Sequence, residues 1–290
     1  AKMRIGDLLR KKETTISFEV FPPKADSSFE PVLKAVDELS ALKPDYISVT
    51  YGAGGAGISK NTVQVASHIQ NELNTTALAH LTCVSNTYED VVAIVNELKA
   101  NNIENILALR GDIPKHAEAS KRDFNYAYEL IDAIKKIGDF SIGCACYPEG
   151  HIEAANKQMD LEHLKEKVEH GCDFLITQMF FDNNVLYSFL YNALKKGIDK
   201  PVDAGVMPVT NIKQIEKIFA LSGTSSLTPK FKAILDKFGD KPQALKQAGI
   251  AYATDQIVDL VANGVSGIHV YVMNRPDVAQ KIMDNLSEIF

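Results

Sequence analysis

The chain has 290 residues, of which 46% are hydrophobic and 23% charged, and its formal net charge is −6. This composition is typical of a globular protein with a large core, and the acidic balance argues against a general affinity for nucleic acid or an anionic membrane. No apolar run is long enough for a signal peptide or for a membrane span of roughly 20 residues. We therefore expect a cytoplasmic protein.

The first predicted strand lies in the stretch ISFEVFPPK, residues 16–24. It must end near Phe21, because Pro22 and Pro23 lack the amide hydrogen that a strand ladder needs. Glu19 therefore lies close to the carboxyl end of a strand. On this stretch alone it is either an ordinary surface acid or a half-buried proton donor.

Strand-like and helix-like segments then alternate along the chain. Further strands are predicted at 45–51, 76–83, 103–110, 140–147, 174–181, 202–209 and 267–273. Helices are predicted at 29–42, 59–73, 87–100, 126–137, 154–170, 184–196, 212–221 and 277–289. Residues 228–263 are helical without an intervening strand. Alternation of this kind implies parallel pairing, and eight evenly spaced strands without a linker favour a single domain, residues 1–290, folded as a (β/α)8 TIM barrel with extra helices before the last strand.

The glycines between Gly52 and Gly57 match the pattern G-x-G-x-x-G. A Rossmann dinucleotide site is the alternative that this motif offers. However, Glu72, twenty residues after Gly52, falls in the tail of a predicted helix and not at the tip of the next strand. A barrel loop of small residues over a ligand explains the glycines equally well.

Catalysis in a barrel takes place at the carboxyl ends of its strands. The predicted ends are polar and comprise Glu19, Thr50, His80, Arg110, Asp112, Tyr147, Glu149, Thr177, Gln178, Thr210, Asn274 and Arg275. Because parallel strands end at one rim, these side chains would surround a single pocket. Folding alone does not call for such a ring.

Other chemistries find less support. The histidines lack the spacing of a zinc site, no G-x-S-x-G elbow occurs, and no strand-end lysine indicates a Schiff base. We interpret the four cysteines as structural thiols; they are Cys83, Cys144, Cys146 and Cys172. Asp160, His163 and Lys167 share one helical face, which alone is most simply a solvated one. Arg110 either pairs with Asp112 or binds a ligand. A rim of this kind suits a bound organic cofactor.

The strand ends together resemble the methylenetetrahydrofolate reductase family, in its short bacterial form that consists of the catalytic barrel alone. The resemblance rests on SFEVFPPK, SVTYGA, HLTC, ALRGD, YPEGH, ITQMFFD, MPVTNIKQ and NRP, in this order. It implies reduction of 5,10-methylenetetrahydrofolate to 5-methyltetrahydrofolate with FAD as cofactor. The hydride comes from NADH or NADPH, or the electrons come from a partner protein.

The resemblance also implies residue roles. Glu19 matches the general acid that protonates folate N10, and we expect a poorly solvated site to keep it protonated. Asp112 matches an acid near flavin and pterin. The implied cofactor-binding residues are Thr50, His80, Arg110, Gly111, Asp112, Tyr126, Ala127, Tyr147, His151, Ala154, Asp160, His163 and Lys167. The implied substrate-binding residues are Glu19, Thr50, Asp112, Gln178, Gln214 and Arg275.

Two positions depart from the expected pattern: His163 stands where we expect an asparagine, and Ile218 where relatives can place a phenylalanine, although Phe219 is adjacent. A homo-oligomer or a complex with a partner subunit is expected. The alternatives are a cofactor-free barrel lyase and a flavin- or folate-binding protein that receives electrons from a partner subunit.

Overall fold

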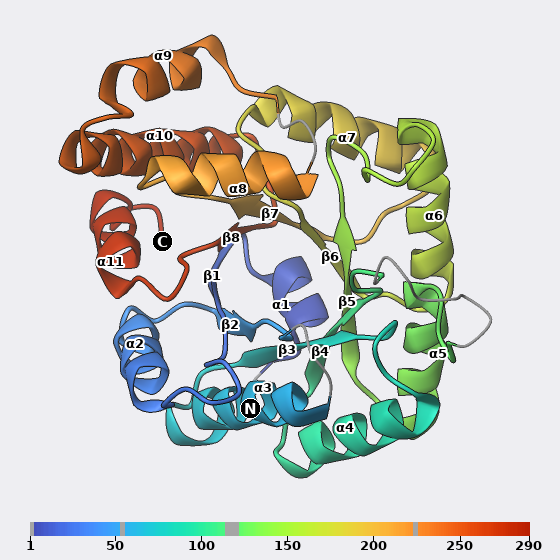
Figure 1. The fold of residues 1–290 in the computed structure, drawn as a ribbon. Helices are drawn as coiled ribbons and strands as arrows, with labels where there is room; N and C mark the ends of the chain where they lie inside the picture. Colours follow the sequence, from blue (N-terminus) through green and yellow to red (C-terminus); the bar gives the residue numbers. More distant parts are fainter. Residues whose placement is uncertain (1–2, 53–55, 114–121, 223–225) are drawn as a thin grey trace.

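The computed structural model describes residues 3–52, 56–113, 122–222 and 226–290. Eight parallel strands form a closed barrel in the order β1 to β8, each strand paired with its neighbours in sequence and β8 paired with β1 (Figure 1). The strands are β1 Thr15–Val20, β2 Tyr46–Val49, β3 Ala77–Thr82, β4 Asn105–Leu109, β5 Ser141–Cys146, β6 Phe174–Thr177, β7 Val202–Val206 and β8 Gly267–Val270. The predicted barrel is thus confirmed, and the doubly wound open sheet is excluded. Residues 53–55 of the glycine motif lie outside the described part of the chain.

Helices surround the barrel in Figure 1. They are α2 Glu30–Ala41, α3 Ala56–Ser67, α4 Tyr88–Ala100, α5 Ala127–Ile137, α6 Lys157–Glu169, α7 Asn183–Lys195, α8 Ile212–Ser222 and α11 Pro276–Asn285. The extra helices expected before the last strand are α9 Pro229–Phe238 and α10 Pro242–Ala262. A short π-helical turn, His68–Glu72, continues α3. None of the helices in these ranges has the length and apolar character needed to cross a bilayer.

Three strands end three or four residues earlier than predicted. β6, β7 and β8 stop at Thr177, Val206 and Val270, although the apolar runs continue for three or four residues. The residues beyond these ends, including Phe180, Met207 and Val272, remain buried in loops. The apolar pattern therefore predicted correctly which residues are buried, but it could not predict where the hydrogen bonds between strands end.

Helix α1, Ile5–Lys11, was not predicted, and it closes the amino end of the barrel. The amide of Ile5 donates to Asn105 Oδ1 (2.9 Å) and that of Gly6 to Ser141 Oγ (3.1 Å), at the first residues of β4 and β5. Ile5 and Leu9 belong to one buried cluster with Tyr46, Leu78, Leu107, Phe174 and Ile176. The lower barrel interior is thus apolar and covered, which leaves the carboxyl end for a site.

Side chains along each strand alternate between two surroundings, as a pleated strand requires. In β1, Ile16, Phe18 and Val20 join the core between strands and helices. The intervening Ser17 and Glu19 make polar contacts inside the barrel. The upper barrel interior is therefore polar, in contrast to the apolar layer above α1.

Candidate active site

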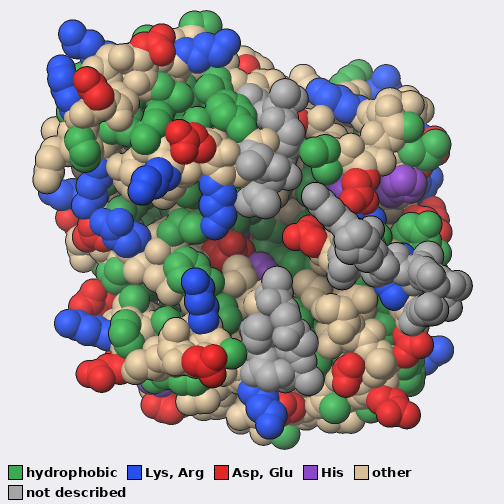
Figure 2. Space-filling model, viewed as in Figure 1, with side chains coloured by type: hydrophobic (Ala, Val, Ile, Leu, Met, Phe, Trp, Pro, Cys, Tyr) green, Lys and Arg blue, Asp and Glu red, His purple; other side chains and the backbone are tan. Residues whose placement is uncertain are grey.

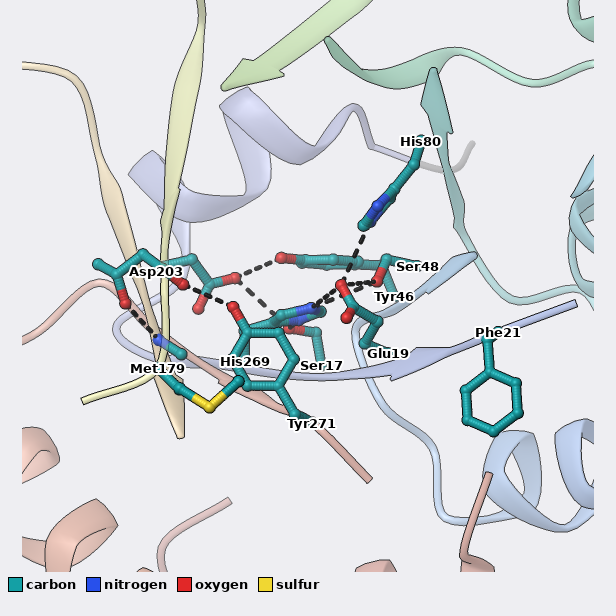
Figure 3. A network of polar contacts seen from close by, with 12 residues as sticks. Ser17, Glu19, Phe21, Tyr46, Ser48, His80, Met179, Asp203, His269 and Tyr271 are labelled. Carbon is teal, nitrogen blue, oxygen red and sulfur yellow. Dashed lines mark hydrogen bonds and ion pairs between the residues drawn. The ribbon is translucent and has the colours of Figure 1, made fainter. Parts of the chain in front are cut away.

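The face of the molecule shown in Figure 2 is hollowed at its centre, with acidic and histidine side chains visible inside the hollow. Glu19, on β1, retains 19% side-chain exposure among buried neighbours. Its Oε1 lies 3.3 Å from His80 Nε2 and 3.4 Å from His269 Nε2, and Ser48 Oγ donates to the same oxygen (3.2 Å). Glu19 is therefore a carboxyl group held between two imidazoles, as Figure 3 shows.

This surrounding corrects the expectation that the site keeps Glu19 protonated. Burial alone would raise the pKa of Glu19, but hydrogen bonds with His269 and His80, together with their charges, lower that pKa well below its usual range. Hydrogen bonds donated to a carboxyl group favour its charged form. The two imidazoles therefore favour the ionised form of Glu19.

A chain of polar groups continues from Glu19 into the barrel (Figure 3). On the far side of His269, Nδ1 lies 2.7 Å from Ser17 Oγ, which is 3.4 Å from Asp203 Oδ2. Tyr46 O–H donates to the same oxygen of Asp203. The Tyr46 ring stacks on His269, with centroids 5.6 Å apart and an interplanar angle of 15°. Strands β1, β2, β7 and β8 thus supply one connected network.

Asp203 is fully buried. Burial raises its pKa to about 6, and the charge of His269 and the hydrogen bonds from Tyr46 and Ser17 oppose this rise only in part. Its Oδ1 has no hydrogen-bond partner among the described residues. The network therefore contains two carboxyl groups whose pKa values are displaced in opposite directions, an arrangement typical of proton-transfer sites.

A second group of expected residues meets between the end of β5 and α6. They line, in part, a cavity of about 250 Å³ that includes Tyr147 and the largely buried Asp160. His151 packs edge-on against the Tyr147 ring at 4.6 Å. Lys167 Nζ donates to Ala145 O (2.7 Å) and lies 5.9 Å from the Tyr147 ring centroid. Cation, aromatic ring and imidazole together can bind a ligand that carries phosphate groups and an aromatic ring.

Helix α6 does not present the expected residues as one solvated face. Asp160 is buried, and burial is the largest influence that raises its pKa. Lys167 is half-buried, whereas His163 is exposed. Burial lowers the pKa of the nearby His151, with a further contribution from the charge of Arg110. Of the three predicted residues, Asp160 lines the cavity and Lys167 lies beside Tyr147, whereas His163 is exposed to solvent.

The segment after β4 presents three further predicted residues. Arg110 forms an ion pair with Glu153 (2.6 Å), not with Asp112. Gly111 has a φ of +85°, and a Cβ there would lie 3.0 Å from Thr82 Cβ, which favours glycine. Asp112 is exposed, and among the described residues no hydrogen bond or ion pair joins it to the Glu19 network.

Four more residues on the cofactor list lie at strand or helix ends. The Thr50 amide donates to Val20 O (3.0 Å), which places Thr50 beside β1. Tyr126 is exposed directly before α5, which begins at the buried Ala127. The Ala154 amide donates to His151 O (3.0 Å) in the turn before α6. These residues border the same carboxyl-end face.

The expected substrate residues have partners of their own. Gln178 follows β6, and its amide donates to Cys146 O (2.8 Å). Gln214 Oε1 accepts from the Thr210 amide (2.7 Å), which caps the start of α8. Arg275 forms a two-pronged contact with Asp277, at 3.1 and 3.0 Å. The side chains of Gln214 and Arg275 are therefore already engaged in contacts within the protein.

Sequence reasoning missed the residues beneath the rim, among them Ser17, Ser48, Asp203 and His269. Polar residues at every second position of the predicted strands were the sequence signal that could have indicated these interior residues. In the described ranges, no group of three or more His, Cys, Asp or Glu is arranged to hold a metal ion. The four cysteines are free and buried.

A polar pocket at the carboxyl end of a closed barrel is where (β/α)8 enzymes carry out catalysis, so fold and site together define a barrel enzyme. Comparison with known proteins identifies the family within this class of barrel enzymes. A family model described as methylenetetrahydrofolate reductase matches residues 4–287. The 5,10-methylenetetrahydrofolate reductase of Escherichia coli (strain K12) is 34% identical over 275 residues, covering 94% of this chain and 91% of that protein. The chain belongs to the methylenetetrahydrofolate reductase family, and it is an oxidoreductase.

Other similar proteins add detail. "Methylenetetrahydrofolate reductase (NADH) 1" of Arabidopsis thaliana is 33% identical over 301 residues, which cover 99% of this chain but 50% of the plant protein. Among solved structures, an uncharacterized protein from Clostridium thermocellum that binds two copies of 5-methyl-5,6,7,8-tetrahydrofolic acid has a TM-score of 0.64 at 13% identity, covering 98% of this chain and 100% of that one. At this identity the structural likeness shows the fold alone.

Proposed function

We propose that the protein reduces 5,10-methylenetetrahydrofolate to 5-methyltetrahydrofolate with bound FAD, and that Glu19 is the general acid of the reaction. Family membership supports the reduction of the folate, and the C. thermocellum protein with the same fold is described as binding the methylated product. The observation that carries the role of Glu19 is its position: a carboxyl group, partly exposed, held between His80 and His269 at the carboxyl end of the barrel.

The donor groups of the rim fit FAD. His80 is buried and its Nε2 lies 3.3 Å from Glu19 Oε1, so a ring bound beside Glu19 would also contact this imidazole. Lys167 and Arg110 supply positive charge suited to a diphosphate, and the cavity beside Tyr147 and Asp160 suits an adenosine. Gly111 allows the backbone to approach a ring closely. When bound, FAD supplies hydride transfer between a nicotinamide and the folate.

Glu19 delivers a proton to N10 of the folate. This proton opens the five-membered ring and leaves an electrophilic iminium at N5. Asp112, in the segment after β4, supplies negative charge that stabilises the iminium. Gln178 positions the pterin through its amide side chain. Arg275, once released from Asp277, suits the carboxylates of the folate tail.

The electron donor is NADH or NADPH, or a partner protein. Ile218 is 5% exposed and packs in a side cluster with Phe231 and Met207, and Phe219 is half-buried against the same cluster. This burial leaves little aromatic surface over which a nicotinamide ring can stack. Rates measured with NADH, NADPH and an artificial donor distinguish the candidates, and slow rates with both nicotinamides beside a fast artificial donor point to a partner protein.

A donor-independent test uses the protein reconstituted with FAD and reduced by light in the absence of oxygen. The visible spectrum should show one bound flavin per chain, and 5,10-methylenetetrahydrofolate should reoxidise it with an equal amount of 5-methyltetrahydrofolate formed. A protein that takes up no added FAD, or a reduced protein that the folate leaves reduced, refutes the proposal. The first of these outcomes favours a barrel enzyme without a cofactor.

A further inference from the structure

The surroundings of Glu19 favour its ionised form, whereas a general acid must carry a proton before the reaction. The buried network beneath Glu19 offers a source for that proton. Asp203, Ser17 and His269 follow one another inside the barrel with no side-chain exposure, and Glu19 alone among the four has a partly exposed side chain.

We propose that Asp203 stores the proton that Glu19 delivers, and that this proton reaches Glu19 through Ser17 and His269. The inference rests on the proposed role of Glu19. Asp203, Ser17 and His269 act through Glu19 and touch no substrate, so they are positioning residues for the acid.

Three contacts connect the two carboxyl groups. Asp203 Oδ2 lies 3.4 Å from Ser17 Oγ, Ser17 Oγ lies 2.7 Å from His269 Nδ1, and His269 Nε2 lies 3.4 Å from Glu19 Oε1. A hydroxyl group and an imidazole can each donate at one atom position while accepting at another. The contacts therefore form an unbroken path in which every intermediate group can pass a proton on.

The transfer balances without any other reactant. In the resting state, protonated Asp203 donates to Ser17 Oγ, the Ser17 hydroxyl donates to His269 Nδ1, and His269 Nε2–H donates to ionised Glu19. Each proton then moves to its acceptor along the path, so that three O–H or N–H bonds break and three form. Asp203 ends as a carboxylate, Glu19 ends protonated, and Ser17 and neutral His269 keep their proton counts. Each hydrogen bond has reversed its direction.

The residues around Asp203 suit a store of this kind. Asp203 is buried, and Oδ1 has no partner in the described part of the chain, which favours the neutral form of Asp203. Tyr46 O–H donates to Oδ2 and stabilises the carboxylate after the proton has left. The other titratable groups near Asp203 are His269, Tyr271 and Asp45. Asp45 is itself held by Lys12, at 2.9 and 2.8 Å.

The Glu19 end has its own neighbours. They are His80, His269 and Tyr271, with Ser48 as a neutral donor. Tyr271 O–H is occupied by Thr177 O (2.5 Å) and lies outside the path. His80 contacts Glu19 Oε1 but has no described link to Asp203. The path through His269 is therefore the one that joins the two acids.

Infrared spectroscopy tests the store without any reaction. The wild-type protein should show the carbonyl stretch of a buried protonated carboxyl group that titrates near pH 6, and Asp203→Asn should remove this band. Glu19→Gln should leave it in place. A band that survives Asp203→Asn and disappears in Glu19→Gln, or the absence of any band that titrates in this range, overturns the proposal.

Single-turnover oxidation of the reduced FAD enzyme by 5,10-methylenetetrahydrofolate tests the path. Ser17→Ala removes the hydroxyl that links Asp203 to His269 and is less disruptive than a change of the buried acid. We expect the folate step to slow by about tenfold or more, within the range typical of general acid catalysis, and to lose its decline as pH rises through 6. Reduction of FAD by the electron donor should keep the wild-type rate.

Ser48→Ala is the matched control, because it also removes a hydroxyl that contacts Glu19 Oε1 (3.2 Å) and His269 Nε2 (3.3 Å) but leaves Ser17 between Asp203 and His269 in place. This variant should keep the pH dependence of the wild type. If Ser17→Ala and Asp203→Asn keep the wild-type rate and pH dependence while Glu19→Gln is slow, the relay is wrong and the proposed function stands. If Glu19→Gln itself reduces the folate at the wild-type rate, the proposed role of Glu19 as the general acid fails.

Discussion

The buried Asp203 predicts a specific pH dependence of folding stability. An ordinary aspartate in the unfolded chain has a pKa of 3.8, and in the folded protein burial raises the pKa of Asp203 to about 6. Between these two values the folded state holds a proton that the unfolded state has lost. Asp203 therefore stabilises the fold less and less as pH rises from 3.8 to 6, and the loss is complete above this window.

The magnitude follows from the difference of about two pKa units, at 1.36 kcal/mol for each unit, so the free energy of unfolding should fall by about 3 kcal/mol across the window. Asp203→Asn removes this contribution. We expect the variant to gain about 3 kcal/mol relative to the wild type between pH 4 and pH 7, whatever the offset between the two proteins at pH 4. Glu19 is present in both proteins, so its opposite contribution, which is lost at lower pH, cancels in the comparison.

Urea denaturation of both proteins at several pH values and constant ionic strength measures this difference. Tyr46→Phe provides a control, because loss of the Tyr46 hydrogen bond removes an influence that lowers the pKa of Asp203. In that variant the window should extend to higher pH. A stability difference between Asp203→Asn and the wild type that does not change with pH would refute the reasoning.

Three further substitutions test other parts of the structure. Lys167→Gln should weaken FAD binding by roughly tenfold in a fluorescence titration. Lys165→Gln is the control, because it removes only a contact with Glu169 on the same helix, and it should leave FAD binding unchanged. Equal losses of affinity in the two variants would argue against a role for Lys167. Gly205→Ala should destabilise the fold by about 2 kcal/mol in thermal unfolding, because its Cβ would lie 2.5 Å from Thr177 O, and an unchanged Tm would contradict this packing. Gln214→Glu retains the acceptor that caps α8, so stability should hold while the KM for the folate rises; an unchanged KM would leave Gln214 with the cap alone.

The fold and the rim follow from local patterns in the sequence. The alternation of strands and helices implied a parallel barrel, and the ends of parallel strands must meet at one edge. Polar residues at those ends, such as Glu19 and His80, could therefore be placed near each other without a structure. Helix α1 escaped prediction because it has seven residues and no side-chain cap at Arg4, and contacts with β4 and β5 stabilise it.

The interior of the barrel was harder to foresee. Ser17 and Glu19 alternate with Ile16 and Phe18, which marks one face of β1 as polar, but nothing local says that this face looks into the barrel. The ionisation of Glu19 depends on His269, which is 250 residues away in sequence. Burial alone predicted a raised pKa for Glu19, and only the folded arrangement of the imidazoles reverses that direction.

The role of Glu19 in proton delivery is tested most directly by Glu19→Gln, with the two halves of the reaction measured separately by stopped flow. Because the amide retains the shape of the side chain but is not an acid, reduction of bound FAD by its donor should proceed as in the wild type. Oxidation of the reduced enzyme by 5,10-methylenetetrahydrofolate should slow by about a hundredfold or more. A variant that reduces the folate as fast as the wild-type enzyme would contradict the assignment of Glu19 as the general acid.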